Sequence, residues 1–172
     1  MTGTHRRIKR LLPCVCLLLL ATALTHAKAW RGIVPLHSTR ADVMRRLGKP
    51  NPRNNHHELK TQRAYIYYSD GTPCAKAPEG AWNVPRDTVV SILVRPKKKL
   101  WFSDLKLDLQ KFKKVKDQEL EHRTRYRNEE EGITYEVFEG GGENDGLILY
   151  IEYGPSAEDK HLQCPATVER PN

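Results

Sequence analysis

The chain has 172 residues, of which 29% are charged and 38% are hydrophobic, and its formal net charge is +8. This balance is typical of a globular domain and excludes a disordered or fibrous protein. Beyond the N-terminus no apolar run approaches the roughly 18–20 residues of a membrane-spanning helix, which excludes a polytopic membrane protein.

The first 29 residues have the pattern of a secretory signal peptide. A basic cluster at residues 6–10 precedes an apolar run at residues 11–24, and two small-residue cleavage sites end at Ala27 and Ala29. Pro13 stands where a lipid-anchored leader has a small residue. We therefore expect export to the periplasm or the extracellular space, with residues 30–172 as a single mature domain without a membrane span.

Removal of this leader changes the charge and leaves two cysteines. Five of the 29 basic residues and no acidic residue are lost, so 24 basic residues face 21 acidic ones and the net charge becomes +3. Nucleic-acid binding then has no support from composition. Cys74 and Cys164 remain, and an even pair in an exported protein predicts a disulfide. Neither cysteine has the close His or Cys neighbours of a metal site.

The first predicted element is a helix over residues 40–47. Thr39 is a favourable N-cap, with Asp42 three residues later. Val43 and Leu47 share one helical face. The helix ends at Gly48, which can adopt a left-handed conformation.

Strands and a second helix follow. Residues 64–68 and 87–95 are predicted strands, and the second is apolar on both faces, which favours a central position with a helix or sheet on each side. Ser103 begins a predicted short helix with Leu105 and Leu109 on one face. Residues 111–116 form a predicted edge strand whose lysines discourage aggregation.

The last third predicts a meander of three strands, at residues 123–128, 133–138 and 147–153. A four-residue hairpin loop ending at Gly132 places Arg125 opposite Glu136 and Tyr126 opposite Tyr135. Residues 156–162 predict a final helical turn that presents Cys164. The order α-β-β-α-β-β-β with short connections predicts an α+β fold, an antiparallel sheet with short helices packed on it, as one layer or as two similar halves.

Motifs of catalytic and metal sites are absent from the sequence. Neither a Gly-x-Ser-x-Gly nor a His-Glu-x-x-His motif is present. His56 and His57 are interpreted as a solvated loop pair, since their neighbours are Asn54, Asn55 and Lys60. The glycines at 140–142 lead into a strand and are interpreted as linker residues. No catalytic, cofactor-binding or metal-binding residue is predicted.

Two groups of residues form a candidate binding surface. Arg123, Arg125 and Arg127 alternate along one strand, so they share a face that could contact an anionic envelope component such as phospholipid or cell-wall polymer. A solvated polar face is the alternative. Trp82 and Trp101 could anchor a protein partner, or they could belong to the core.

Residues 32–50 carry a family resemblance. The pattern Gly-Ile-x-Pro-Leu-x-Ser-Thr-x-x-Asp-Val-x-x-x-Leu-Gly-x-Pro resembles the opening helix of the small outer-membrane lipoprotein family (SmpA/OmlA, BamE-like), and β-lactamase-inhibitor-like folds begin similarly. The segment at residues 82–89 resembles uncharacterised exported bacterial proteins. The resemblance implies an α+β binding module at the cell envelope. It transfers no functional residue.

The sequence favours an exported, non-enzymatic binding or scaffolding module of the cell envelope, with a protein or an anionic envelope component as partner. An inhibitor of a secreted enzyme is one alternative. The other is a hydrolase with dispersed catalytic residues, for which the candidates are His37, His57, Asp87 and His122. No motif orders these four residues.

Overall fold

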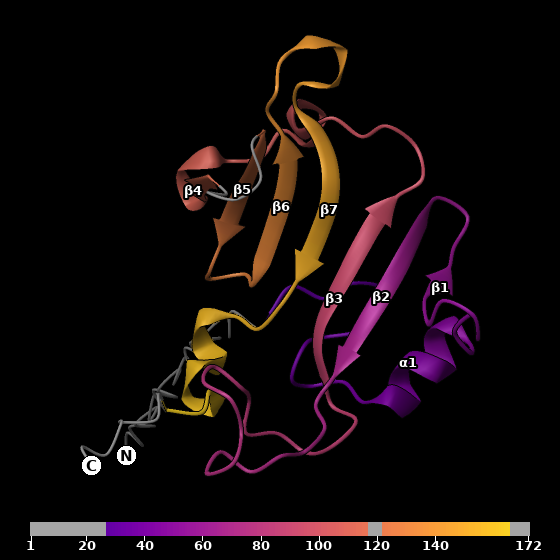
Figure 1. Cartoon of the computed structure of the whole chain (residues 1–172), viewed down its shortest axis with the longest axis vertical. Helices are drawn as coiled ribbons and strands as arrows, with labels where there is room; N and C mark the ends of the chain where they lie inside the picture. The colour runs from indigo at the N-terminus through magenta and orange to yellow at the C-terminus, as the bar shows by residue number, and fades with distance from the viewer. Residues whose placement is uncertain (1–26, 117–121, 166–172) are drawn as a thin grey trace, which may run out of the picture.

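The computed structural model describes residues 27–116 and 122–165, and an antiparallel sheet of seven strands organises them (Figure 1). The strand order is β1-β2-β3-β7-β6-β5-β4, so the sheet is one continuous layer, which is one of the two arrangements that the sequence left open. The strands are β1 (His57–Glu58), β2 (Gln62–Tyr68), β3 (Val89–Pro96), β4 (Lys113–Lys116), β5 (Arg123–Asn128), β6 (Ile133–Phe138) and β7 (Leu147–Tyr153). The antiparallel sheet with few helices is compatible with the predicted α+β class and with a mostly-β class.

The helix α1 (Arg40–Leu47) lies at the β1–β2 end of the sheet (Figure 1) and has the predicted limits. The Thr39 side chain accepts a hydrogen bond from the Asp42 amide, and the Asp42 carboxylate accepts one from the Thr39 amide. This capping box satisfies amides that the first helical turn leaves unpaired. Val43 is fully buried and brings the apolar face of α1 onto the sheet.

One face of the sheet carries both hydrophobic clusters of the core. At the β2–β3 end, α1 and the segment around Trp30 and Ile33 cover Ala64, Ile66, Val89, Ile92 and Val94. At the β5–β7 end, the connection between β3 and β4 covers Ile133, Tyr135, Val137 and Ile148. Ile151 and Tyr153 of β7 pack against both clusters, so β7 joins them.

The predicted second helix is wrong. The connection between β3 and β4 contains two 3-10 turns, η1 (Phe102–Leu105) and η2 (Leu109–Lys111). Leucines recur here at every second position, which does not match a helical period. Leu105 and Leu107 pack on the core, whereas Leu109 is 54% exposed and does not share a buried face with Leu105.

The predicted register of β5 and β6 is confirmed, since Arg125 lies opposite Glu136 and Tyr126 lies opposite Tyr135. β4 is an edge strand, as its lysines predict. β3 is central, but the prediction that both its faces are covered is wrong. Ile92 and Val94 are buried, whereas Ser91 and Leu93 on the opposite face are only partly buried and border a hollow. That second face of the sheet is called the open face below.

The predicted leader falls almost entirely outside the described residues, which include only its last three positions. Lys28 there donates its backbone amide to the Glu131 carbonyl at 2.8 Å, and its Nζ lies 2.8 Å from the Glu131 carboxylate. Within the described ranges, no helix has the length and apolar character needed to span a membrane.

Candidate functional site

Two hollows on the open face form one continuous depression, which we call the trough. The first, of about 420 Å³, lies over β5, β6 and the end of β7, and the second, of about 410 Å³, reaches β3 and β2. Arg125, Thr134 and Glu152 line both hollows, so the trough crosses the strands without a break. Such a crossing groove exists because neighbouring strands place alternate side chains on the same face.

One side of the trough is a wall built from two distant segments. The 3-10 helix η4 (Ala157–Leu162) follows β7, and Trp82 comes from the long connection between β2 and β3. Trp82 and Gln163 form a β-bridge, and on either side the Asn83 amide donates to the Leu162 carbonyl at 2.8 Å and the Cys164 amide donates to the Ala81 carbonyl at 2.7 Å. The wall therefore comprises residues 81–83 and 157–164.

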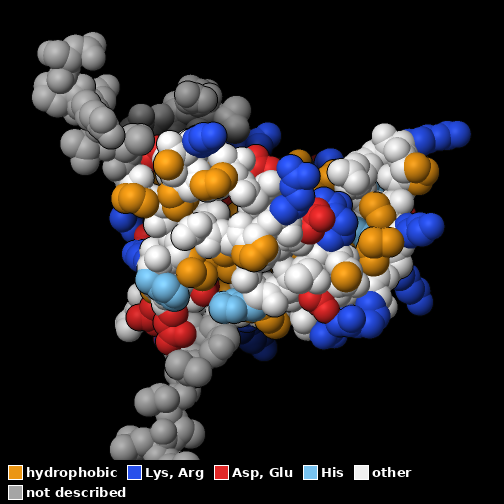
Figure 2. Space-filling model, turned by 90° about the horizontal axis from the view of Figure 1, so that it is seen from below, with side chains coloured by type: hydrophobic (Ala, Val, Ile, Leu, Met, Phe, Trp, Pro, Cys, Tyr) orange, Lys and Arg blue, Asp and Glu red, His pale blue; other side chains and the backbone are white. Residues whose placement is uncertain are grey.

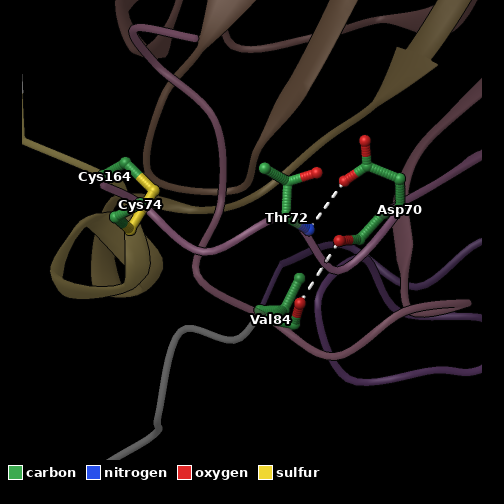
Figure 3. Close-up of a disulfide and its surroundings, with 6 residues drawn as sticks. Asp70, Thr72, Cys74, Val84 and Cys164 are labelled. Atoms are coloured by element: carbon green, nitrogen blue, oxygen red, sulfur yellow. Dashed lines mark hydrogen bonds between the residues drawn. A yellow bond between two sulfur atoms is a disulfide. The ribbon is translucent and has the colours of Figure 1, made fainter. Parts of the chain in front are cut away.

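The disulfide between Cys74 and Cys164 is present and fastens this wall, as Figure 3 shows beside η4. The two Cα atoms are 5.2 Å apart. The same connection is also tied to the end of β2, because the Ser69 hydroxyl donates to the Val84 carbonyl at 3.2 Å. The Thr72 amide donates to the Asp70 carboxylate at 2.8 Å (Figure 3). Trp82 thus lies between two fixed points.

The three predicted arginines lie on the open face, but their surroundings differ. Arg123 and Arg125 both donate to the Glu136 carboxylate, at 2.8 and 3.3 Å, and the Glu136 side chain is only 14% exposed. Arg127 is exposed, lies opposite Thr134 on β6 and lines the trough. Its side chain has no hydrogen bond or ion pair with any residue of the two described ranges. Arg127 is therefore the arginine that remains available to a ligand.

The two predicted tryptophans occupy separate places. Trp82 lines the trough together with Arg125 and Arg127, so the fold brings three of the five predicted surface residues together. Trp101 lies in the connection between β3 and β4, forms a β-bridge with Leu147, and has its ring 5.9 Å from Lys99 Nζ. Trp101 is not among the residues that line the trough.

The wall contains a buried carboxylate, Asp159. One oxygen lies 2.9 Å from His37 Nε2, and the other accepts hydrogen bonds from the amide and the hydroxyl of Ser156, both at 2.8 Å. Burial alone would raise the pKa of Asp159, but the hydrogen bonds from Ser156 and His37 outweigh it and hold the pKa below its ordinary value. The carboxylate is therefore ionised at neutral pH and stabilises the turn that begins η4.

Several residues of the trough escaped sequence reasoning. Tyr67, Leu93 and Tyr150 line the end over β2 and β3, and Lys160 lines the end near Trp82. Arg95 lies over the Tyr150 ring at 5.8 Å. The alternation of polar and apolar residues in β2 could have placed Tyr67 on the open face. Nothing local could have placed β7 beside β3. Seen from below, the molecule has small separate groups of hydrophobic side chains among charged ones (Figure 2).

The residues named for a hydrolase are not assembled into one site. His37 contacts Asp159, Asp87 accepts a hydrogen bond from Arg40 at 2.7 Å, and His122 packs against Phe138 with ring centroids 5.8 Å apart. Asp159 lies between His37 and Ser156, whereas an activated serine needs the imidazole itself as its neighbour.

The interpretation of His56 and His57 as a solvated pair is wrong. Each is only 5% exposed, because His57 belongs to β1 and pairs with Ala64, while His56 packs on Tyr65 at 5.3 Å. Burial first, and the neighbouring His56 second, lower the pKa of His57. Within the described residues, no group of three or more His, Cys, Asp or Glu side chains could hold a metal ion.

Comparisons with protein-family models, with curated proteins and with solved structures find no match. The trough combines a concave shape, aromatic rings and an available guanidinium group in one place.

Proposed function

We propose that this chain is an exported binding module and that its ligand docks in the trough. The observation that carries the proposal is the convergence of Trp82, Arg125 and Arg127 in one hollow. Trp, Tyr and Arg side chains supply most of the binding energy at protein interfaces, and the trough contains all three residue types. Export is supported by the leader pattern and by the disulfide, which forms in oxidising compartments.

The positions of the exposed large hydrophobic side chains also favour the trough as the binding site. Four such residues occur in the described ranges, and Tyr67 and Val115 line the trough with exposed fractions of 52% and 43%. The other two, Met44 and Leu109, do not line it, with exposed fractions of 42% and 54%. A ligand that fills the trough would remove both side chains from water, which adds to the free energy of binding.

The surroundings of the residues considered for acid–base catalysis are compatible with a binding role. Each of His37, Asp87 and His122 has its own structural contact, as described above, and the trough contains none of them. The envelope setting implied by the resemblance to small outer-membrane lipoproteins fits a module of this kind and stays an expectation.

Site-specific photo-crosslinking in the producing cells tests the proposal. A photoreactive phenylalanine analogue replaces Tyr67 or Val115 in the trough and Met44 or Leu109 as controls of matched exposure. The proposal expects one adduct of the same mass from both trough positions and none from the control positions. The partner in the adduct is then identified. The purified partner should bind the wild type and should not bind a Trp82→Ala variant. Equal adducts at all four positions, or none at the trough positions, would contradict the proposal.

A further inference from the structure

The available positive charges lie at one end of the trough. Lys113 of β4 lies directly opposite Arg127 of β5, on the open face, and like charges in this position repel each other. Neither side chain has a hydrogen bond or ion pair with a residue in the described ranges. A hollow of about 480 Å³ is lined by both residues and adjoins the trough through Arg127 and Glu129. Its other charged residues are Lys111 and Glu130, so three cations face two carboxylates there. We call Lys113 and Arg127 the basic corner.

The rest of the trough is close to neutral. Glu136 accepts hydrogen bonds from Arg123 and Arg125, and Lys160 Nζ lies 3.6 Å from the Glu129 carboxylate. The basic corner is consequently where an anionic group of a ligand gains most. A carboxylate there would relieve the repulsion and accept charge-assisted hydrogen bonds from Arg127.

The opposite end of the trough has a different character. Tyr67, Leu93 and Tyr150 line it, over β2, β3 and β7. Tyr67 is 52% exposed, although burial of an aromatic ring away from water is favourable. This end therefore suits an apolar side chain of the ligand.

The distance between the two ends sets the size of the ligand. The basic corner begins on β4 and Tyr67 lies on β2, so the ligand would cross six adjacent strands with five spacings between them. With about 4.8 Å between neighbouring strands, the trough is about 24 Å long. An extended polypeptide of about seven residues spans this length at about 3.3 Å per residue.

We infer that the trough binds an extended polypeptide segment that places carboxylates at the basic corner and an apolar side chain between Tyr67 and Tyr150. The inference rests on the proposed function and specifies its ligand. The composition of the trough, with Trp, Tyr and Arg as anchors, favours a protein ligand. A planar membrane surface fits less well, because the wall with Trp82 and Lys160 borders the hollow in which Arg127 lies.

Fluorescence anisotropy with synthetic peptides tests this inference on the purified, oxidised protein. The probe is a labelled peptide of about nine residues with two Glu near one end and Val-Leu near the other. It is made in both sequence orders, because the trough does not fix the direction of the chain. One control peptide has Gln in place of Glu, and a second has Ser in place of Val-Leu. Vesicles that contain phosphatidylglycerol form the third arm.

The protein variants isolate the basic corner. Arg127→Thr and Lys113→Thr each remove one of its charges, and Lys98→Thr removes the same charge from an exposed position outside the trough. We expect the acidic peptide to bind about tenfold more tightly than the Gln peptide. Arg127→Thr and Lys113→Thr should each abolish most of that difference, and Lys98→Thr should leave it unchanged. The Ser peptide should bind more weakly than the probe to all four proteins.

Two results would overturn the inference. One is equal affinity for the Glu and Gln peptides. The other is vesicle binding that depends on Arg127 and Lys113 in the absence of peptide binding, which would assign the basic corner to an anionic lipid. If crosslinks persist at Tyr67 and Val115 while either result is obtained, the inference fails and the proposed function stands. If the crosslinks are absent as well, both fail.

Discussion

The Nε2 atom of His37 lies 2.9 Å from Oδ1 of Asp159, and this contact joins the segment before α1 to the wall of the trough. His37 is half-exposed, with 43% of its side chain accessible, whereas the Asp159 side chain is only 5% exposed. Ser156 occupies the second oxygen of the same carboxylate. The wall is thus fixed from two sides, by Asp159 at its beginning and by the disulfide at its end.

Replacement of Asp159 should loosen the wall. Asp159→Asn keeps the shape but removes the buried charge that accepts three hydrogen bonds, so we expect a loss of about 2–3 kcal/mol in the free energy of unfolding. Chemical denaturation checks this, with Asp104→Asn as the control at an exposed carboxylate. An equal effect of the two substitutions would contradict the role given to Asp159.

The lowered pKa of Asp159 also predicts a dependence on pH. In the folded state the Asp159 carboxyl stays ionised at pH values somewhat below its ordinary pKa of 3.8. Its contribution to the free energy of unfolding is therefore complete above about pH 4 and is lost as the pH falls through the folded-state pKa. The wild type should therefore lose stability more steeply in this acid range than Asp159→Asn. Parallel slopes for the two proteins would refute the assignment.

Removal of the disulfide should destabilise the protein and open the wall. For a loop of 90 residues the chain-entropy model gives about 4.6 kcal/mol, and measured values are often smaller. In the double variant Cys74→Ala/Cys164→Ala, the backbone amides at positions 83 and 164 should exchange hydrogen faster than those in the middle of β6. Hydrogen exchange followed by mass spectrometry measures both regions. Unchanged exchange at the wall would show that the disulfide does not hold it.

His57 predicts a second dependence on pH, near neutrality. Its pKa is lowered from 6.5 in the folded state, so the unfolded chain binds more protons as the pH falls below 6.5 and the folded state loses stability there. The contribution is complete above about pH 6.5. The slope of unfolding free energy against pH between 6.5 and 5 should decrease in His57→Gln and should persist in the exposed-site control His161→Gln. The slopes can be compared even if His57→Gln is less stable than the wild type at every pH.

Lys113 and Arg127 predict a conflict between stability and binding. Since the two charges repel each other across the strands, Lys113→Thr should raise the free energy of unfolding by about 0.2–1 kcal/mol. The same variant should bind the acidic peptide more weakly. A double-mutant cycle with Arg127→Thr measures the repulsion directly, and a favourable coupling between the two residues would contradict it.

The local features of the fold were predictable because short-range physics determines them. The Thr39 cap, the Gly132 turn and the period-two pattern of β6 each involve residues within a few positions of one another. They gave the limits of α1 and the register of β5 and β6. β1 escaped prediction because it has only two residues, and the buried environment of its His57 comes from α1 and β2.

The trough was only partly predictable, since it depends on contacts between distant segments. Alternation along β5 correctly placed three arginines on one face. It could not reveal that Glu136 accepts hydrogen bonds from two of them. Nor could it reveal that Trp82, on the disulfide-bound wall, lines the same hollow as the third. The pairing of β3 with β7 joins strands separated by three others in the sequence, and no local pattern specifies it.

The disulfide also closes a covalent ring that contains every strand from β3 to β7. A protease that cuts the backbone once inside this ring yields two fragments that stay linked through sulfur and through the neighbouring strands. Such a nicked molecule migrates as a single species until a thiol is added. One broken peptide bond inside this ring therefore need not release any strand of the sheet.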